Sequence, residues 1–215
     1  MNMTAVKGPA KPRTRRAEQA ERTRRRILAA ASELFLSRGY AAATIEAIAA
    51  KADVATETVY GRFSSKAGLL NAILGPAISG TGEHTSVLDH PELAEIRACP
   101  DQRRQLQLLA RFSRHILQRT DPLHRILDTA ASSDPDAAEL RRADRENRYQ
   151  GQRTYIDMLL ANGPLRDGLT PEGAHTTYST LASPETYAFL TGDRGWVPQQ
   201  YEVWLADSLA RLLLP

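Results

Sequence analysis

The sequence predicts an all-α protein with a small basic domain over residues 18–75 and a larger helical domain over residues 76–215. Three observations lead to this prediction. Apolar residues recur at intervals of three and four along most of the chain, as in amphipathic helices. No segment alternates apolar and polar residues in the manner of a half-buried strand. Gly and Pro separate the periodic segments, so we expect about nine helices.

The first segment, residues 1–17, differs from the rest of the chain. It contains Gly8, Pro9 and Pro12 and almost no large apolar side chain, so we expect a disordered basic arm. It also lacks the apolar stretch of a signal peptide. The basic residues from Lys7 to Arg16 either contact a polyanion or form a solvated tail, and the sequence leaves both possibilities open.

Four helices are expected in the first domain. The first runs from about Glu18 to Gly39, a residue suited to a left-handed C-cap. Thr44 is a suitable N-cap for the second, which leads through a tight turn to a third helix over about 55–62. The fourth begins near Ser65 and should end before the Gly-Pro pair at 75–76.

The second domain follows a polar connector and should contain five more helices. Asp-Pro pairs at 121–122 and 134–135 mark the starts of two of them, and Pro171 and Pro198 the starts of two others. We expect Pro184 to kink one helix. The expected ranges are about 106–117, 123–127, 135–161, 171–189 and 198–213.

Charge is distributed unevenly between the two parts. Residues 1–70 contain thirteen Lys and Arg but six Asp and Glu, a balance of +7, whereas the other 145 residues carry −4. A basic front and a mildly acidic remainder indicate that the front of the chain meets a polyanion.

The third helix is short and polar, and its few apolar residues, Val54, Val59 and Phe63, should face the core. Its outward side chains suit the major groove of DNA, because Thr, Arg and Glu can hydrogen-bond base edges. Glu57 either reads a cytosine or turns aside to pair with a neighbour such as Arg62. Tyr, Lys and an exposed helix start suit phosphates. The predicted DNA-binding residues are Thr44, Thr56, Glu57, Thr58, Tyr60, Arg62 and Lys66.

Residues 23–73 contain "ELFLSRGY", Thr44, "IAAKADV", "TVYGRF" and "SSKAGLL" in this order. This set resembles the DNA-binding domain of the tetracycline-repressor (TetR) family. The resemblance implies a transcriptional regulator, a repressor, that binds a palindromic operator in double-stranded DNA as a homodimer and responds to a small-molecule effector. Two positions depart from the family pattern. Asp53 stands where the turn often has Gly, and Ala55 where the third helix often has a Ser or Thr cap.

The second domain is similar to the family in its number of helices and in its ending. Residues 183–214 resemble the pair of helices through which family members dimerise, although this segment could instead pack only on its own domain. The candidate interface residues are Tyr201, Trp204, Leu205, Leu209 and Leu212.

Candidate effector contacts lie on helices that would surround a pocket in this architecture: Phe112, His115, Tyr149, Tyr155 and Tyr178. Each could instead belong to the core or the surface. The polar stretch at 141–153 is either solvated or lines a polar cavity, and the sequence does not choose between them.

Other classes of protein find little support. The single cysteine, Cys99, allows no disulfide within the chain, which fits a cytoplasmic protein. No apolar run approaches the roughly 18 residues of a membrane span. We expect no metal, no cofactor and no enzymatic activity, because no phosphate loop, nucleophile elbow or metal-ligand spacing occurs; "EHTSVLDHPE" gathers acids and histidines without helical ligand spacing. The alternative function is a helical ligand-binding or scaffolding module whose first domain docks onto protein.

Overall fold

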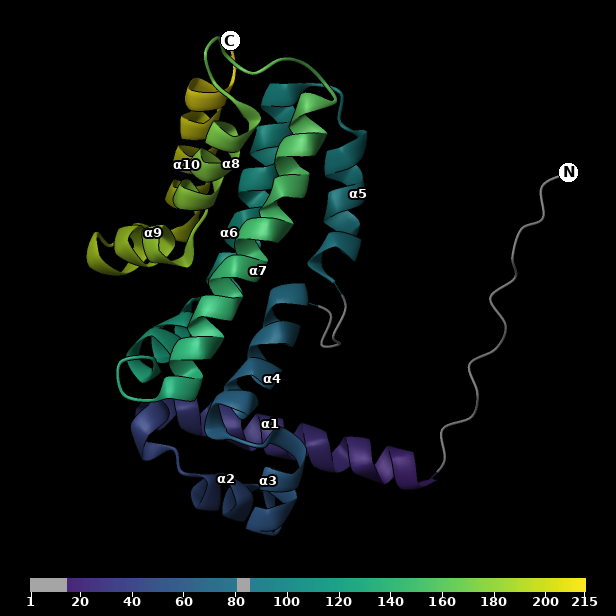
Figure 1. Ribbon diagram of the computed structural model, residues 1–215, viewed down its shortest axis with the longest axis vertical. Helices are drawn as coiled ribbons and strands as arrows, with labels where there is room; N and C mark the ends of the chain where they lie inside the picture. The colour runs from purple at the N-terminus through teal and green to yellow at the C-terminus, as the bar shows by residue number, and fades with distance from the viewer. Residues whose placement is uncertain (1–14, 81–85) are drawn as a thin grey trace, which may run out of the picture.

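The computed structural model describes residues 15–80 and 86–215, and every regular element in them is helical, which confirms the all-α prediction. Figure 1 shows a small head below a body of long helices. The head contains α1 (Arg15–Ala42), α2 (Ile45–Ala52) and α3 (Thr56–Phe63). Helix α4 (Lys66–Ser79) rises from the head into the body.

The body is built around two long helices that run side by side, α6 and α7, with α8 and α10 on one side and α5 on the other (Figure 1). Two short turns, η1 (Val87–Asp89) and η2 (Phe189–Asp193), complete it. The helices are α5 (Pro91–Ala98), α6 (Gln102–Ala130), α7 (Pro135–Leu160), α8 (Pro171–Leu181), α9 (Pro184–Ala188) and α10 (Pro198–Leu213).

The expected signals in the head are present. Gly39 has a φ of 74° and breaks the helical path near the end of α1. The Thr44 Oγ1 accepts the Ala47 N–H at 3.1 Å and caps α2, as predicted. Helix α1 starts at Arg15, earlier than expected, so the end of the predicted arm is helical. The rest of the arm, residues 1–14, lies outside the described residues.

Proline positions account for most of the wrong boundaries. The two helices expected around Pro122 are one continuous helix, α6, in which Pro122 is exposed while Leu117, Leu123 and Leu127 are buried. A proline inside a helix costs about 3 kcal/mol, and each buried leucine contributes about 1.5–3 kcal/mol, so packing on both sides of the proline keeps the helix intact. Pro184, expected to kink a helix, is instead the first residue of α9.

Helix α4 also continues past its expected end. It passes Pro76 and stops at Ser79, where Gly80 takes the left-handed conformation with a φ of 71°. The guanidinium of Arg119, on α6, donates to the carbonyls of Ala77 at 3.1 Å and Ile78 at 3.2 Å. These bonds satisfy carbonyls that a helix end leaves free, so α6 stabilises the extended end of α4.

The apolar core has two parts. One lies in the body, between α5, α6, α7, α8 and α10. The other fills the head but also includes Leu123, Leu127 and Ala130 of α6 and Ala137 of α7. The core of the head therefore continues into the turn between the two long helices. No helix within the two described ranges is long and apolar enough to cross a membrane.

Candidate DNA-binding surface and ligand cavity

The turn between α2 and α3 is held by a side chain from α1. Asp53 adopts the left-handed conformation, with a φ of 51° and a ψ of 57°, which Asp tolerates better than most residues. Arg26 donates to the Ala52 carbonyl at 2.5 Å and to the Asp53 carboxylate at 2.8 Å. Arg26 was not predicted to have this role, because nothing local distinguishes it from the neighbouring Arg24 and Arg25.

Helix α3 presents its polar side to the outside. Val59 is fully buried, whereas Glu57, Tyr60 and Arg62 are exposed, with Tyr60 49% exposed. Thr56 and Thr58 are partly exposed. The polar side of α3 is thus exposed to solvent on the head, as predicted. Among the described residues no ion pair joins Glu57 to Arg62, so that alternative for Glu57 has no support in the structure.

Two further features of α3 concern its start and its outermost point. Ala55 makes no side-chain cap bond, so the start of the helix lacks the about 1 kcal/mol that a Ser or Thr cap contributes. Gly61 follows Val59 by two positions and so faces almost directly away from the core, at about 200° around the helix. A Cβ added at Gly61 would meet no atom within 4 Å. Gly61 leaves a flat outer surface and was not among the predicted site residues.

Lys66, predicted to contact phosphate, is the first residue of α4 and is half-buried. Its Nζ donates to the Tyr40 carbonyl at 2.8 Å and lies 4.1 Å from the centre of the Tyr40 ring. Burial lowers the pKa of Lys66. The ammonium group therefore already has partners within the chain that hold α4 against the end of α1.

Tyr40 also connects the head to the body. Its hydroxyl donates to Asp134 Oδ2 at 2.7 Å, while Asp134 Oδ1 accepts the N–H of Asp136 at 2.9 Å and caps α7. The Tyr40 hydroxyl holds the pKa of the Asp134 carboxyl below its usual value. Burial, together with the nearby carboxylate, raises the pKa of Tyr40. One tyrosine thus links α1 and α4 to the start of α7.

A cavity of about 380 Å³ lies between α4, α6 and α7, close to the junction of α8 and α9. This volume is at the lower end of the range for ligand sites, about 300–1,000 Å³. Phe112 and Tyr155, two of the predicted effector contacts, line it. Leu74 and Ile78 of α4 form part of its wall, so the helix that enters the head also borders the cavity.

The other three predicted effector contacts do not line this cavity. Tyr178 is fully buried behind it and shares a 2.7 Å hydrogen bond with Ser113, which does line the cavity. The His115 Nδ1 lies 3.3 Å from a Glu92 oxygen. The Tyr149 hydroxyl donates to Glu172 at 2.6 Å. These two side chains thus contact acids on α5 and α8.

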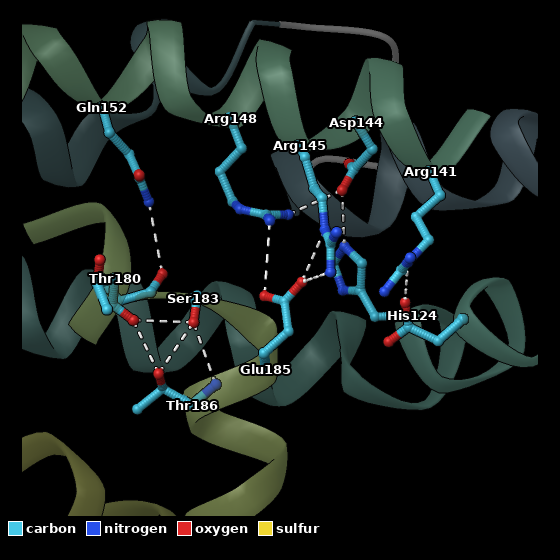
Figure 2. A network of polar contacts seen from close by, with 12 residues as sticks. His124, Arg141, Asp144, Arg145, Arg148, Gln152, Thr180, Ser183, Glu185 and Thr186 are labelled. Atoms are coloured by element: carbon cyan, nitrogen blue, oxygen red, sulfur yellow. Dashed lines mark hydrogen bonds and ion pairs between the residues drawn. The ribbon is translucent and has the colours of Figure 1, made fainter. Parts of the chain in front are cut away.

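The polar stretch of α7 proves to have two faces. Asp144, Arg148 and Gln152 recur every fourth residue and line the cavity, while Arg142 and Gln150 are exposed. Figure 2 shows this polar wall, with Arg148 donating to Asp144 at 2.8 Å. Burial would raise the pKa of Asp144, but its contacts with His124 and Arg148 outweigh burial and hold that pKa below its usual value. The sequence left open whether this stretch is solvated or lines a polar cavity. One side of α7 lines the cavity and the other is exposed to solvent.

Three of the five predicted interface residues face inward. Tyr201, Leu205 and Leu209 are fully buried in the core of the chain itself, so they cannot contact a partner directly. They form the stripe of α10 that packs on α6, whereas Trp204 is half-buried and Leu212 is 42% exposed. The exposed large apolar side chains of this part of the chain are Phe189, Val197, Val203 and Leu212.

The described residues contain no group of three or more His, Cys, Asp and Glu arranged to hold a metal. In the acidic and histidine-containing segment, His90 caps the Glu92 N–H at 3.3 Å and its ring lies 5.2 Å from that of Phe112. His84 of the same segment lies outside the described residues.

Known proteins resemble this chain in two ways. Residues 27–73 match the family model of the bacterial regulatory proteins of the tetR family. The HTH-type transcriptional regulator YvkB of Bacillus subtilis (strain 168) is 40% identical over 70 residues, which are 33% of this chain and 35% of YvkB. The match thus spans about a third of that curated relative's length.

Solved structures share the fold over most of the chain. A transcriptional regulator from Saccharomonospora viridis, in complex with choline, superposes with a TM-score of 0.66 at 23% identity and covers 91% of this chain and 99% of its own. NalD, the secondary repressor of the MexAB-OprM multidrug efflux pump in Pseudomonas aeruginosa, superposes with a TM-score of 0.60 at 24% identity. The match covers 92% of this chain and 98% of NalD. Residues 27–73 thus match the bacterial regulatory proteins of the tetR family, and the chain as a whole shares its fold with solved transcriptional regulators.

Proposed function

We propose that this protein is a ligand-responsive, sequence-specific transcriptional regulator, a repressor, that binds a palindromic operator as a homodimer in the cytoplasm. The displayed polar face of α3 carries this proposal, because a helix with one buried side and an outer row of Thr, Tyr and Arg fits the major groove. We assign no enzymatic activity to it. NalD, which has the same fold, is described as a repressor.

Helix α4 supports the response to a ligand. Leu69 and Leu70 of α4 are buried in the core of the head, while Leu74 and Ile78 border the cavity. A ligand that fits the cavity better in one position of α4 would favour that position and with it one placement of α3. The related fold from Saccharomonospora viridis was solved with a small molecule, choline.

The dimer would use the surface of α9, η2 and α10. Of the six exposed large apolar side chains in the described ranges, four lie between Phe189 and Leu212. Such a concentration of exposed apolar side chains marks an interaction surface. Two heads joined in this way would present two copies of α3 to successive half-sites of the operator.

Selection of bound sequences from random duplex DNA tests the proposal. We expect enrichment of an inverted repeat, and an affinity for it that falls steeply with salt because phosphate contacts release counterions. Docking of the head onto a protein, the alternative function, predicts neither result. Failure to enrich any sequence at low salt would contradict the proposed function.

A further inference from the structure

Two buried side chains in the polar wall of the cavity each have an atom without a hydrogen-bond partner among the described residues. Gln152 is 8% exposed and His124 is 7% exposed, and both line the cavity. The Gln152 Nε2 donates to the Ala182 carbonyl at 3.4 Å (Figure 2), but Gln152 Oε1 and His124 Nδ1 have no hydrogen-bond partner among the described residues. Buried polar groups are nearly always bonded, so both atoms are suited to a ligand.

The charged side chains that line the cavity, Asp144 and Arg148, are already compensated by each other and by neighbouring residues. The Asp144 Oδ2 lies 2.8 Å from Arg148 and 3.4 Å from His124 Nε2. Arg148 also lies 3.8 Å from Glu185, which Arg145 contacts at 2.6 Å (Figure 2). The two carboxylates thus face two guanidinium groups. An ionic ligand would find no unpaired opposite charge here, and burial of an unpaired charge is costly.

The rest of the lining is mainly apolar. Leu74, Phe112, Ile116, Leu140 and Tyr155 come from three different helices and surround the polar wall. Gly151 lies between Arg148 and Gln152 on the cavity side of α7, and a Cβ added there would meet no atom within 4 Å. The space next to Gln152 is therefore open enough for an apolar body.

We propose that the cavity takes an uncharged, mostly apolar molecule that donates one hydrogen bond, from an O–H or N–H group, to Gln152 Oε1. His124 Nδ1 offers a second polar contact. This inference rests on the proposed function in so far as the cavity is taken as the effector site. It adds the chemical class of the effector and the residue that selects it.

Four biphenyl probes test the ligand class in calorimetric titrations of the full chain: the 4-hydroxy, 4-methoxy, 4-carboxylate and 4-trimethylammonium derivatives. We expect the phenol to bind about tenfold or more tightly than the ether, because a site that hydrogen-bonds a hydroxyl discriminates against analogues without it. Both ions should bind at least as weakly as the ether. The inference would be overturned if the ether or either ion bound as tightly as the phenol or more tightly, or if the phenol did not bind.

Two variants connect the preference to the residues. Gln152→Met removes the acceptor at nearly constant size, so the phenol and the ether should bind within about twofold of each other. Gln150→Met, an exposed change on the same helix, should leave the preference as in the wild type. Gly151→Leu should fill the cavity and abolish binding of the phenol. An unchanged preference in Gln152→Met, or phenol binding that survives Gly151→Leu, would refute the assignment.

A DNA-release assay separates this inference from the proposed function. The phenol is added to the complex of the protein with its selected operator. Release confirms the cavity as the effector site. If the phenol binds with the expected discrimination but the operator stays bound, the ligand class stands and the proposed response to the ligand fails.

Discussion

Tyr40 bonds to the start of α4 through its carbonyl and to the start of α7 through its hydroxyl. It is 5% exposed, and its ring is stacked on Phe35 at 5.6 Å. Such a residue acts through position rather than through contact with DNA or ligand. It keeps the first turn of α4 and the cap of α7 in register with the head.

Tyr40→Phe should lower the free energy of unfolding by about 1 kcal/mol at neutral pH, because it removes the hydrogen bond to Asp134. The pKa of Asp134 is depressed in the folded state, so its contribution is complete above the unfolded pKa, about 3.9. The contribution is lost as the pH falls through the folded pKa. Urea unfolding of both proteins at pH 7 and at acidic pH measures this difference.

The matched control is Tyr60→Phe, which alters a 49% exposed tyrosine of the same head and should leave stability unchanged. A loss in Tyr40→Phe that stays the same at every pH would show that the carboxylate does not take part.

Arg62 is exposed on the outer side of α3 and is predicted to read a base. Arg62→Ala should weaken binding to the selected operator about tenfold to a hundredfold and blur the preference at one base pair, as expected for loss of a contact worth about 1–3 kcal/mol. Anisotropy titrations against the operator and its single-base variants measure both effects. Arg142→Ala, which removes the same charge from α7, should change neither. A uniform loss over all DNA sequences would assign Arg62 to a phosphate instead.

Among helices, α3 combines a start without a side-chain cap with a glycine on its exposed side. Its N-cap, Ala55, makes no side-chain bond, and its outermost residue is Gly61. The backbone at Gly61 is helical, so nothing in the conformation requires a glycine. A residue with a higher helix propensity at position 61 would therefore raise the free energy of unfolding.

Gly61→Ala should raise the free energy of unfolding by about 0.5–1 kcal/mol and weaken operator binding, because the methyl group stands where α3 would approach the duplex. Thermal unfolding and an operator titration on the same sample test whether stability rises while operator affinity falls. Gly151→Ala, also in a helix and also facing open space, should bring a similar gain in stability with unchanged DNA affinity when no ligand is present. Tighter operator binding by Gly61→Ala would place this side of α3 away from DNA.

Across the whole molecule, α4 connects the head to the cavity. Helix α10 has one side buried in the core and the other side exposed. Helix α4 contributes to the core of the head and to the cavity wall. Helix α10 buries Leu209 in its own subunit, whereas Val203 is 70% exposed. The oligomeric state should therefore respond to the outer residues of the last helix and folding to the inner ones.

Val203→Glu should dissociate the proposed dimer and leave the fold intact, because it places a charge in the proposed interface without disturbing the core. Sedimentation velocity and circular dichroism measure the two properties. Leu209→Glu should unfold the subunit, since it buries an unpaired carboxylate. Leu36→Glu, at a residue 54% exposed in the head, is the control and should remain dimeric. A dimeric Val203→Glu protein would move the interface elsewhere.

Local signals were sufficient for three features of the head. Thr44 as a cap, Gly39 as a break and the inward position of Val59 depend on interactions within a few residues, so their sequence pattern predicts them directly. The architecture implied by the resemblance gave five candidate effector contacts, of which Phe112 and Tyr155 line the cavity and the other three do not. Local signals failed for Pro122, where the buried leucines on both sides outweigh the local preference of proline to end a helix.

The amino-acid order alone therefore establishes an all-helical chain with a displayed polar helix on a basic front. Packing between distant segments settles the rest: which side of α7 lines the cavity, that Arg26 supports the turn at Asp53, that Tyr40 bonds Asp134, and that Leu209 faces its own subunit. The physical reason is range. Helix periods and caps act over one or two turns, whereas a cavity wall or an inner face exists only once helices far apart in the chain have come together.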